Sequence, residues 1–180
     1  MFANFKKYIA KKIILKEIEK QTSIHSYGFC PLSSVKTVLL LAESDEDEKN
    51  QELHAFKEQL KAEGKKVIVW AFANKKEILS PIFPEFRLFS LSDLSWFGLP
   101  KRELVDQFEA IETDLVISLD MNDSLVLDFL LAKSKAKMKV SKEKGMKQLA
   151  NFMLSIGKDD NRKYFFEQVL FYLNSIQTKN

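Results

Sequence analysis

Three short segments of the chain are strongly apolar, and polar residues bound each of them. They lie at residues 38–42, 67–72 and 115–119. A strand with one face in water alternates apolar and polar side chains, whereas a strand covered on both faces is apolar along its length. The three segments therefore predict strands of a parallel sheet that has helices above and below it.

The first two segments flank an amphipathic helix. Within residues 51–63, the apolar residues Leu53, Phe56 and Leu60 recur at helical spacing, and Gly64 follows as a C-cap. A strand, a helix and a second strand in this order predict a β–α–β unit.

The remaining elements continue this alternation of strands and helices. We expect, in chain order, a helical turn near 75–79, a strand at 87–91, a helix at 101–110, a helix at 124–133, strands at 136–140 and within 148–155, and a final helix at 160–176. The strands at 36–42, 67–72 and 114–119 are predicted to be adjacent and parallel, with 36–42 in the middle. The sequence thus indicates the α/β class, as one three-layer α/β/α domain over residues 36–176 with a mostly parallel sheet, preceded by an N-terminal basic helix within residues 1–25.

The composition is that of a globular protein. The chain has 180 residues, which suits one domain, and 46% of them are hydrophobic and 29% charged. The single cysteine, Cys30, excludes a disulfide within the chain and a structural zinc site built from several thiolates. No segment approaches the ~20 apolar residues of a membrane span, and the start of the chain lacks the apolar core of a secretory signal. We therefore expect a cytoplasmic protein, and no nucleic-acid partner at a net charge of only +3.

Several stretches resemble known families. Residues 38–78, the loop DLSWFGLPK at 93–101 and the segment TDLVISLDMNDSLVLDFLLAKSKAKMKV at 113–140 resemble an uncharacterised bacterial family from Bacteroidota, a domain of unknown function with a Rossmann-like fold. Residues 113–140 also resemble, more distantly, the N-terminal half of heptosyltransferase-type glycosyltransferases, although Ser141 replaces an expected glycine. Those enzymes bind a nucleotide-sugar in a second domain, for which this chain leaves no length, so the resemblance implies the fold rather than the activity.

The junction after the first predicted strand argues against a nucleotide cofactor. A phosphate-binding turn needs glycines and an unblocked helix N-terminus, but residues 42–48 contain no glycine and five carboxylates. These carboxylates would repel a phosphate, so no cofactor is expected. Ser44 and Asp45 are candidates for helix N-caps or, as the alternative, for ligands of a divalent cation, although no dedicated metal site is predicted.

A second candidate site is the polar turn with Asp120, Asn122 and Asp123, which follows the strand at 114–119. Open α/β sheets bind ligands at the carboxyl ends of their strands, but Asp120 or Asp123 also suits the N-cap of the helix that follows. If the strands at 36–42 and 114–119 are neighbours, this turn faces the acidic junction. Their combined negative charge would suit a cation or a basic partner.

Lysines alternate with other residues around the predicted strand at 136–140. Lys133, Lys135, Lys137 and Lys139 recur at period two, which places them along one face or edge of a strand. One interpretation is an edge strand that lysines protect against further pairing. The other is an anion-binding patch formed by Lys135, Lys137 and Lys139 with the lysines that follow them.

The N-terminal segment is basic and predicted to be helical. Residues 1–20 carry six lysines and two glutamates. One apolar stripe runs from Phe2 to Ile13, whereas Ile14 and Ile18 lie on another side of the helix. A helix that is apolar on more than one side favours docking against protein, either its own domain or a second copy of the chain. The alternative is a helix that lies on an anionic membrane surface.

No catalytic constellation can be assembled from the spacing of the residues. His25 and His54 are not expected to share a site, and no Ser-His-Asp, Cys-His or paired-carboxylate arrangement is apparent. His54 is predicted to face solvent. Trp96 and Phe97 are predicted to cap an edge of the core, and the alternative is an exposed recognition surface.

These features favour a binding or interaction module without catalytic chemistry of its own. Its candidate partners are another protein or a second copy of the chain. Two alternatives stay open. One is an enzyme or a degenerate sugar- or nucleotide-handling domain that uses the turn with Asp120, Asn122 and Asp123. The other is a peripheral membrane adaptor that acts through residues 1–20.

Overall fold

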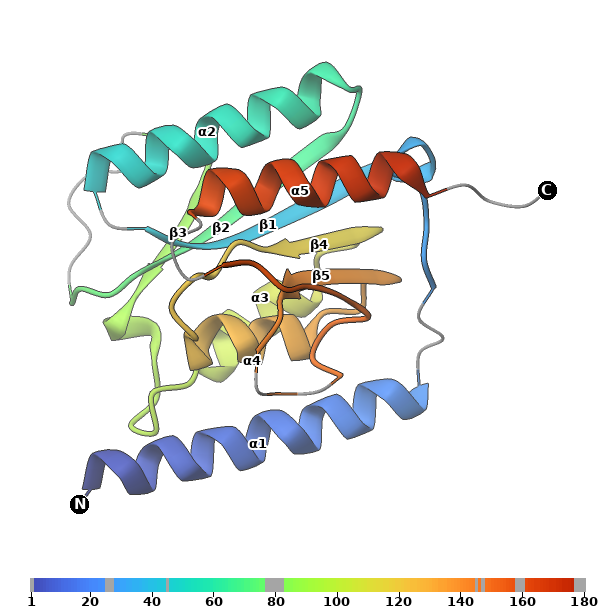
Figure 1. Cartoon of the computed structure of the whole chain (residues 1–180). Coiled ribbons are helices and arrows are strands. Elements are labelled where there is room, and N and C mark those ends of the chain that lie inside the picture. The colour runs from blue at the N-terminus through green and yellow to red at the C-terminus, as the bar shows by residue number, and fades with distance from the viewer. Residues whose placement is uncertain are drawn as a thin grey trace.

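The computed structural model describes residues 2–24, 28–44, 46–76, 83–144, 146, 148–157 and 161–176 (Figure 1). Its strands are β1 (Thr37–Ser44), β2 (Lys66–Ala73), β3 (Arg87–Ser90), β4 (Leu115–Ser118), β5 (Met138–Lys142) and β6 (Phe152–Leu154). Its helices are α1 (Phe2–Ile24), α2 (Glu46–Ala62), α3 (Arg102–Glu109), α4 (Leu125–Lys133) and α5 (Arg162–Ser175), with short 3-10 turns η1 (Leu32–Ser34) and η2 (Leu91–Asp93).

The six strands form one sheet in the order β3-β2-β1-β4-β5-β6, and every named pairing is parallel. Val38 of β1 pairs with Val67 of β2 on one side and with Leu115 of β4 on the other. The prediction of three adjacent parallel strands with β1 in the middle is therefore confirmed. The strand order reverses between β1 and β4, which is the arrangement of a Rossmann-like fold.

Helices cover both faces of this sheet. In Figure 1, α2 and α5 lie on one side of it, and α3 and α4 lie on the other. Along β1, Val38 and Leu40 enter the core beneath α2 and α5, whereas Leu39 and Leu41 enter the core on the side of α4. Because both sets are buried, the apolar run in the sequence is unbroken, as expected for a strand covered on two faces.

Helix α1 forms an additional layer outside α4. Ala10, Ile14 and Ile18 are buried in the core that α4 shares. The Nζ atom of Lys133 on α4 lies 3.1 Å from a carboxylate oxygen of Glu17 on α1 and 3.2 Å from one of Glu109 on α3. The helix therefore docks on its own domain, through the side that carries Ile14 and Ile18.

The lysine-rich segment does not form the expected edge strand. Lys133 ends α4, Lys135 and Lys137 lie in the connection after it, and only Lys139 belongs to β5. Strand β5 pairs with β4 on one side and with β6 on the other, so it is an internal strand. The lysines recur at every second position across the end of a helix and a loop. Their spacing therefore does not reflect the two faces of a single strand, as the prediction had assumed.

Several smaller expectations changed as well. Helix α2 begins five residues before the predicted range of 51–63, and the turn expected near 75–79 falls mostly outside the described residues. Trp96 does not cap the core, because its side chain is 61% exposed. Within the described residues, no helix combines the length and the apolar character that crossing a membrane requires.

Candidate functional site

The carboxyl ends of β1, β4 and β5 meet at one edge of the sheet, where open α/β domains bind ligands. The Nδ2 atom of Asn122, after β4, donates a hydrogen bond of 2.7 Å to Oε2 of Glu43, near the end of β1. Glu43 of the acidic junction and Asn122 of the polar turn therefore face each other, as expected for neighbouring strands.

The Asp120 carboxylate organises the turn after β4. Its Oδ1 atom accepts a hydrogen bond of 2.8 Å from the backbone N–H of Asn122, and its Oδ2 atom accepts one of 2.7 Å from the backbone N–H of Ser124. Asp123 adopts a φ of 56°, in the left-handed region. The N-cap of α4 is Ser124, without a side-chain capping bond, so the prediction that Asp120 or Asp123 is the N-cap was wrong. The tight turn extends through Asp123, so the N-cap of α4 is the next residue, Ser124.

A lysine that follows β5 reaches the same carboxylate. The Nζ atom of Lys144 donates to Oδ2 of Asp120 and, at 2.8 Å, to Oδ1 of Asp128 on α4. The three side chains are at most 3% exposed. Two negative charges and one positive charge therefore lie together in the interior and leave one negative charge in excess.

The environment of this cluster changes its titration. Burial raises the pKa of Asp128 to about 6, an effect that the Lys144 charge only partly offsets. Burial also opposes the charged form of Lys144, but the Asp120 and Asp128 charges outweigh it and raise the lysine's pKa. Lys144 is consequently protonated at neutral pH. The second oxygen of Asp128, Oδ2, is buried and has no hydrogen-bond partner within the described part of the chain.

A cavity of about 330 Å³ adjoins the cluster and is bounded by α1 and α4. Asp123, Asp128 and Lys144 are among the residues that line it. Lys7 and Lys11 line it from α1. The apolar part of its lining consists of Leu15, Leu125 and Met146. A cavity of this size can hold a small molecule, and it lies at the end of the sheet where such ligands are expected.

The crevice between β1 and β4 is closed by side chains of the protein itself. Arg162, at the start of α5, donates from Nη2 to the backbone carbonyl of Glu43 at 3.1 Å, and its Nη1 atom lies 3.6 Å from Oε2 of Glu52. Ser44 is buried and donates from Oγ to Oδ1 of Asn50 at 2.8 Å. Asp45, the other candidate of this junction, lies outside the described residues.

The predicted anion patch is not brought together. Lys135 and Lys137 are exposed, whereas Lys139 is 3% exposed and donates from Nζ to the backbone carbonyl of Ala132 at 3.3 Å. Burial lowers the pKa of Lys139 to about 8. Lys139 is thus a buried polar residue of β5 and does not share a surface with Lys135 and Lys137.

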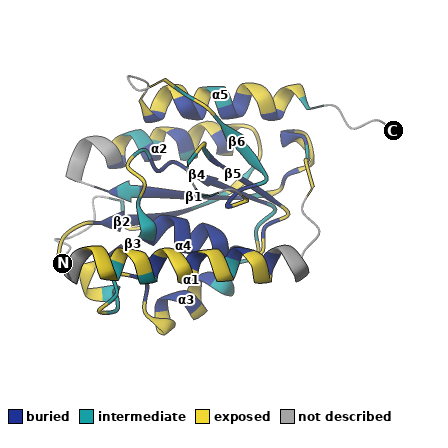
Figure 2. Ribbon diagram, turned by 60° about the horizontal axis from the view of Figure 1, so that its bottom comes forward, coloured by how far each residue is buried: buried dark blue, intermediate teal, exposed yellow. Residues whose placement is uncertain are grey.

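The outer side of α1 is largely exposed (Figure 2), and it carries both lysines and apolar residues. Phe5 and Tyr8 on this side are more than half exposed. The Nζ atom of Lys6 lies 5.6 Å from the centre of the exposed Trp96 ring. The loop that contains Trp96 therefore extends this surface beyond the helix.

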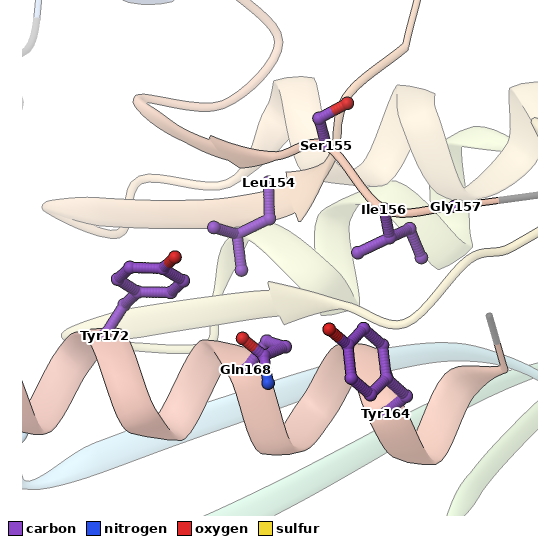
Figure 3. A pocket seen from close by; sticks show the side chains of 7 residues that line it. All are labelled: Leu154, Ser155, Ile156, Gly157, Tyr164, Gln168 and Tyr172. Carbon is purple, nitrogen blue, oxygen red and sulfur yellow. The ribbon is translucent and has the colours of Figure 1, made fainter.

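A second, smaller cavity of about 220 Å³ separates the end of β6 from α5 (Figure 3). Tyr164, Gln168 and Tyr172 line it from successive turns of α5. Leu154 and Ile156 point towards the helix in Figure 3. None of its lining residues is charged, so it offers less chemistry than the cavity beside Asp128. His54, elsewhere on α2, is partly exposed and stacks on Phe83 at 4.6 Å.

The sequence interpretation missed Asp128 and Arg162, and it counted Lys144 among the lysines of the anion patch rather than as the partner of two buried carboxylates. For Asp128 a signal existed, because a single carboxylate in the apolar run LVLDFLLA requires a partner once the helix is buried. Lys144 is one of several lysines after β5, and Arg162 stands at the start of a helix, so neither carried a comparable signal. Among the residues that the structure describes, no group of three His, Cys, Asp or Glu side chains is placed to hold a metal ion.

Comparison with known proteins gives the family. A family model described as a family of unknown function, DUF6913, matches residues 6–176. The chain belongs to this family.

The DUF6913 match includes α1 from Lys6 onwards, together with the whole of the sheet and the whole of α5. Both walls of the cavity beside Asp128 therefore lie within the family region. No curated protein matches the chain. The description of DUF6913 carries no activity, and it does not mention the glycosyltransferases that residues 113–140 resemble.

Proposed function

We propose that this protein is a non-catalytic binding module whose ligand site is the cavity between α1 and α4. The observation that carries the proposal is a buried carboxylate, Asp128, that lines this cavity while its Oδ2 atom lacks a hydrogen-bond partner among the described residues. A buried acceptor without a partner is costly, and the charge of a cationic ligand in the adjoining cavity would offset part of this cost.

The lining residues favour binding over catalysis. They contain no serine, cysteine or histidine that could serve as a nucleophile or as its base. Lys144 is held between two carboxylates that raise its pKa, so it is a poor nucleophile and a poor general base at neutral pH. The groups that remain are suited to recognising charge.

The experiment is a melting-temperature screen with compact amines, carboxylic acids, amino acids, sugars, nucleotides, nucleotide-sugars and divalent cations. A ligand at 100 times its Kd stabilises a protein by about 2.7 kcal/mol. We expect compact ligands to raise the melting temperature, and Leu125→Trp, which fills the cavity, to abolish the effect. Leu91→Trp, at an exposed position on η2, is the matched control.

Two results would contradict the proposal. One is chemical conversion of a bound compound during prolonged incubation, detected by mass spectrometry, which would support the enzyme alternative. The other is a screen in which no compact ligand raises the melting temperature of the wild-type protein.

A second candidate function is that of a peripheral membrane adaptor acting through residues 1–20. It is favoured by the exposed Phe5 and Tyr8 on a helix that also carries six lysines. Basic residues near an anionic bilayer each contribute about 1 kcal/mol of attraction, and inserted apolar side chains add to it. Co-sedimentation with phosphatidylserine vesicles would test this function, with Phe5→Ser as the variant and Phe171→Ser, an exposed residue of α5, as the control. Equal sedimentation of both variants and the wild type would count against it.

A further inference from the structure

Opposite charges line opposite sides of the cavity between α1 and α4. Lys7 and Lys11 contribute positive charge from α1, and both are exposed at its rim. Asp128 and Asp123 contribute negative charge from the α4 side. A ligand with charges of both signs can satisfy both sides at once, whereas a ligand with a single charge meets repulsion on one of them.

The negative side of the cavity favours a cation. Lys144 neutralises one of the two buried carboxylates, Asp120 and Asp128, so the buried cluster keeps one excess negative charge. The Oδ1 atom of Asp128 is occupied by Lys144, and its Oδ2 atom has no hydrogen-bond partner in the described chain. An ammonium group in the adjoining cavity would supply the missing positive charge.

The rest of the lining is apolar. Leu15 of α1, Leu125 of α4 and Met146 contribute side chains to the same cavity. Leucine and methionine side chains favour the aliphatic part of a ligand, since its burial removes apolar surface from water. The cavity therefore combines a site for an ammonium group, a site for an anion and an apolar region between α1 and α4.

We propose that the cavity binds a free α-amino acid with an apolar side chain. Its ammonium group lies towards the carboxylates of Asp123 and Asp128, its carboxylate lies towards Lys7 and Lys11, and its side chain packs against the apolar lining. This inference rests on the proposed binding function, to which it adds the chemical class of the ligand.

Calorimetry with the full-length protein tests the class of ligand. L-leucine is compared with isoamylamine, which lacks the carboxylate, and with isocaproate, which lacks the ammonium group. We expect L-leucine to bind, and each analogue to bind at least about tenfold more weakly, because each loses one charge-assisted interaction. An analogue that binds as tightly as L-leucine overturns the inference, as does the absence of binding by L-leucine, L-methionine and L-phenylalanine together.

Variants assign each charge to its part of the ligand. Asp128→Asn should weaken L-leucine about tenfold or more and leave isocaproate unchanged, since isocaproate has no ammonium group. Lys7→Gln combined with Lys11→Gln should weaken L-leucine and isocaproate but not isoamylamine. Lys12→Gln, on the outer side of the same helix, is the matched control and should change neither ligand.

The remaining outcomes are also decisive. If Asp128→Asn does not fold, Asp123→Asn replaces it, because Asp123 lines the same side and is exposed. An unchanged affinity for L-leucine in the folded acidic-side variant overturns the inference. If other compact compounds bind and Leu125→Trp abolishes their binding while no amino acid binds, the amino-acid inference fails and the proposed binding function stands. If no compact compound binds, both fail.

Discussion

Lys144 holds two buried carboxylates together at the carboxyl end of the sheet. Its side chain is 3% exposed, and it donates to Asp120 and to Asp128. A buried ion pair contributes little net stability compared with a well-packed apolar pair, but removing one partner leaves a buried charge without compensation. The cluster is therefore sensitive to the loss of its cation.

We predict that Lys144→Met destabilises the protein by about 3–5 kcal/mol, because two carboxylates would remain buried without a counter-charge. Urea unfolding followed by circular dichroism measures the change. Lys163→Met, at an exposed position on α5, is the control and should stay within about 0.5 kcal/mol of the wild type. A loss of less than about 1 kcal/mol in Lys144→Met would show that the cluster does not depend on its cation.

The titration of Asp128 predicts a pH dependence of stability. Burial raises its pKa from 3.8 to about 6 in the folded protein, so between these values the folded state holds a proton that the unfolded state has released. The stabilisation is fully present below the unfolded pKa and is lost as the pH rises through the folded pKa. Relative to Asp128→Asn, the free energy of unfolding of the wild type should fall by up to about 3 kcal/mol across this range.

Urea titrations of both proteins at a series of pH values between about 4 and 7 provide the measurement for Asp128. The difference between the two proteins, rather than either curve alone, isolates this carboxyl from other acidic groups such as Asp114, whose hydrogen bonds from the Thr37 and Lys36 backbone lower its pKa. A difference that is constant over the range would mean that Asp128 titrates in the folded state as it does in the unfolded state.

At the scale of elements, α1 has two sides with different roles. The inner side packs Ala10, Ile14 and Ile18 on the α4 layer, and an ion pair between Glu17 and Lys133 fixes its position. The outer side leaves lysines and aromatic residues exposed. The helix thereby completes one wall of the cavity beside Asp128 while it presents a basic surface to the surroundings.

Adjacent isoleucines on α1 provide a direct test of this packing. Ile14 is fully buried, whereas Ile13 is 36% exposed. We predict that Ile14→Ala lowers the free energy of unfolding by about 2–5 kcal/mol, since it leaves a cavity between α1 and the core. Ile13→Ala should cost less than about 1 kcal/mol in the same urea experiment. Similar losses for both variants would mean that α1 does not dock in this orientation.

At the scale of the whole molecule, the strand order reverses between β1 and β4, where Rossmann-like domains bind dinucleotides. In this protein the position is occupied by a hydrogen bond from Asn122 to Glu43 and by Arg162, which donates to the Glu43 carbonyl. The first turn carries carboxylates in place of glycines. The general architecture is thus kept, while the usual dinucleotide site is filled.

We predict no measurable binding of NAD, FAD or ATP at sub-millimolar concentration. A pyrophosphate at the end of β1 would meet the negative charge of Glu43, and residues 42–48 contain no glycine whose backbone N–H group could offset the repulsion. Calorimetry is the measurement, with L-leucine as the comparison ligand. Micromolar affinity for any of the three nucleotides would contradict the prediction.

The sequence by itself determined the layers and the centre of the sheet. A strand covered on both faces must be apolar at successive positions, and β1 and β2 carry this requirement in uninterrupted runs. The helical spacing of Leu53, Phe56 and Leu60 likewise specified the buried face of α2. The meeting of the turn at Asn122 with the junction at Glu43 followed once β1 and β4 were predicted to be neighbours.

Only the tertiary structure decided which charged residues meet. Lys144 lies 24 residues from Asp120 and 16 from Asp128, and Arg162 lies 119 residues from Glu43. Periodicity reports which face of an element is apolar, but the partner of a buried charge depends on where loops bring distant segments together. The alternating lysines show the same limit, because the end of α4 separates Lys133 from the buried Lys139 of β5. The fold was encoded locally, whereas the candidate site was assembled by long-range contacts.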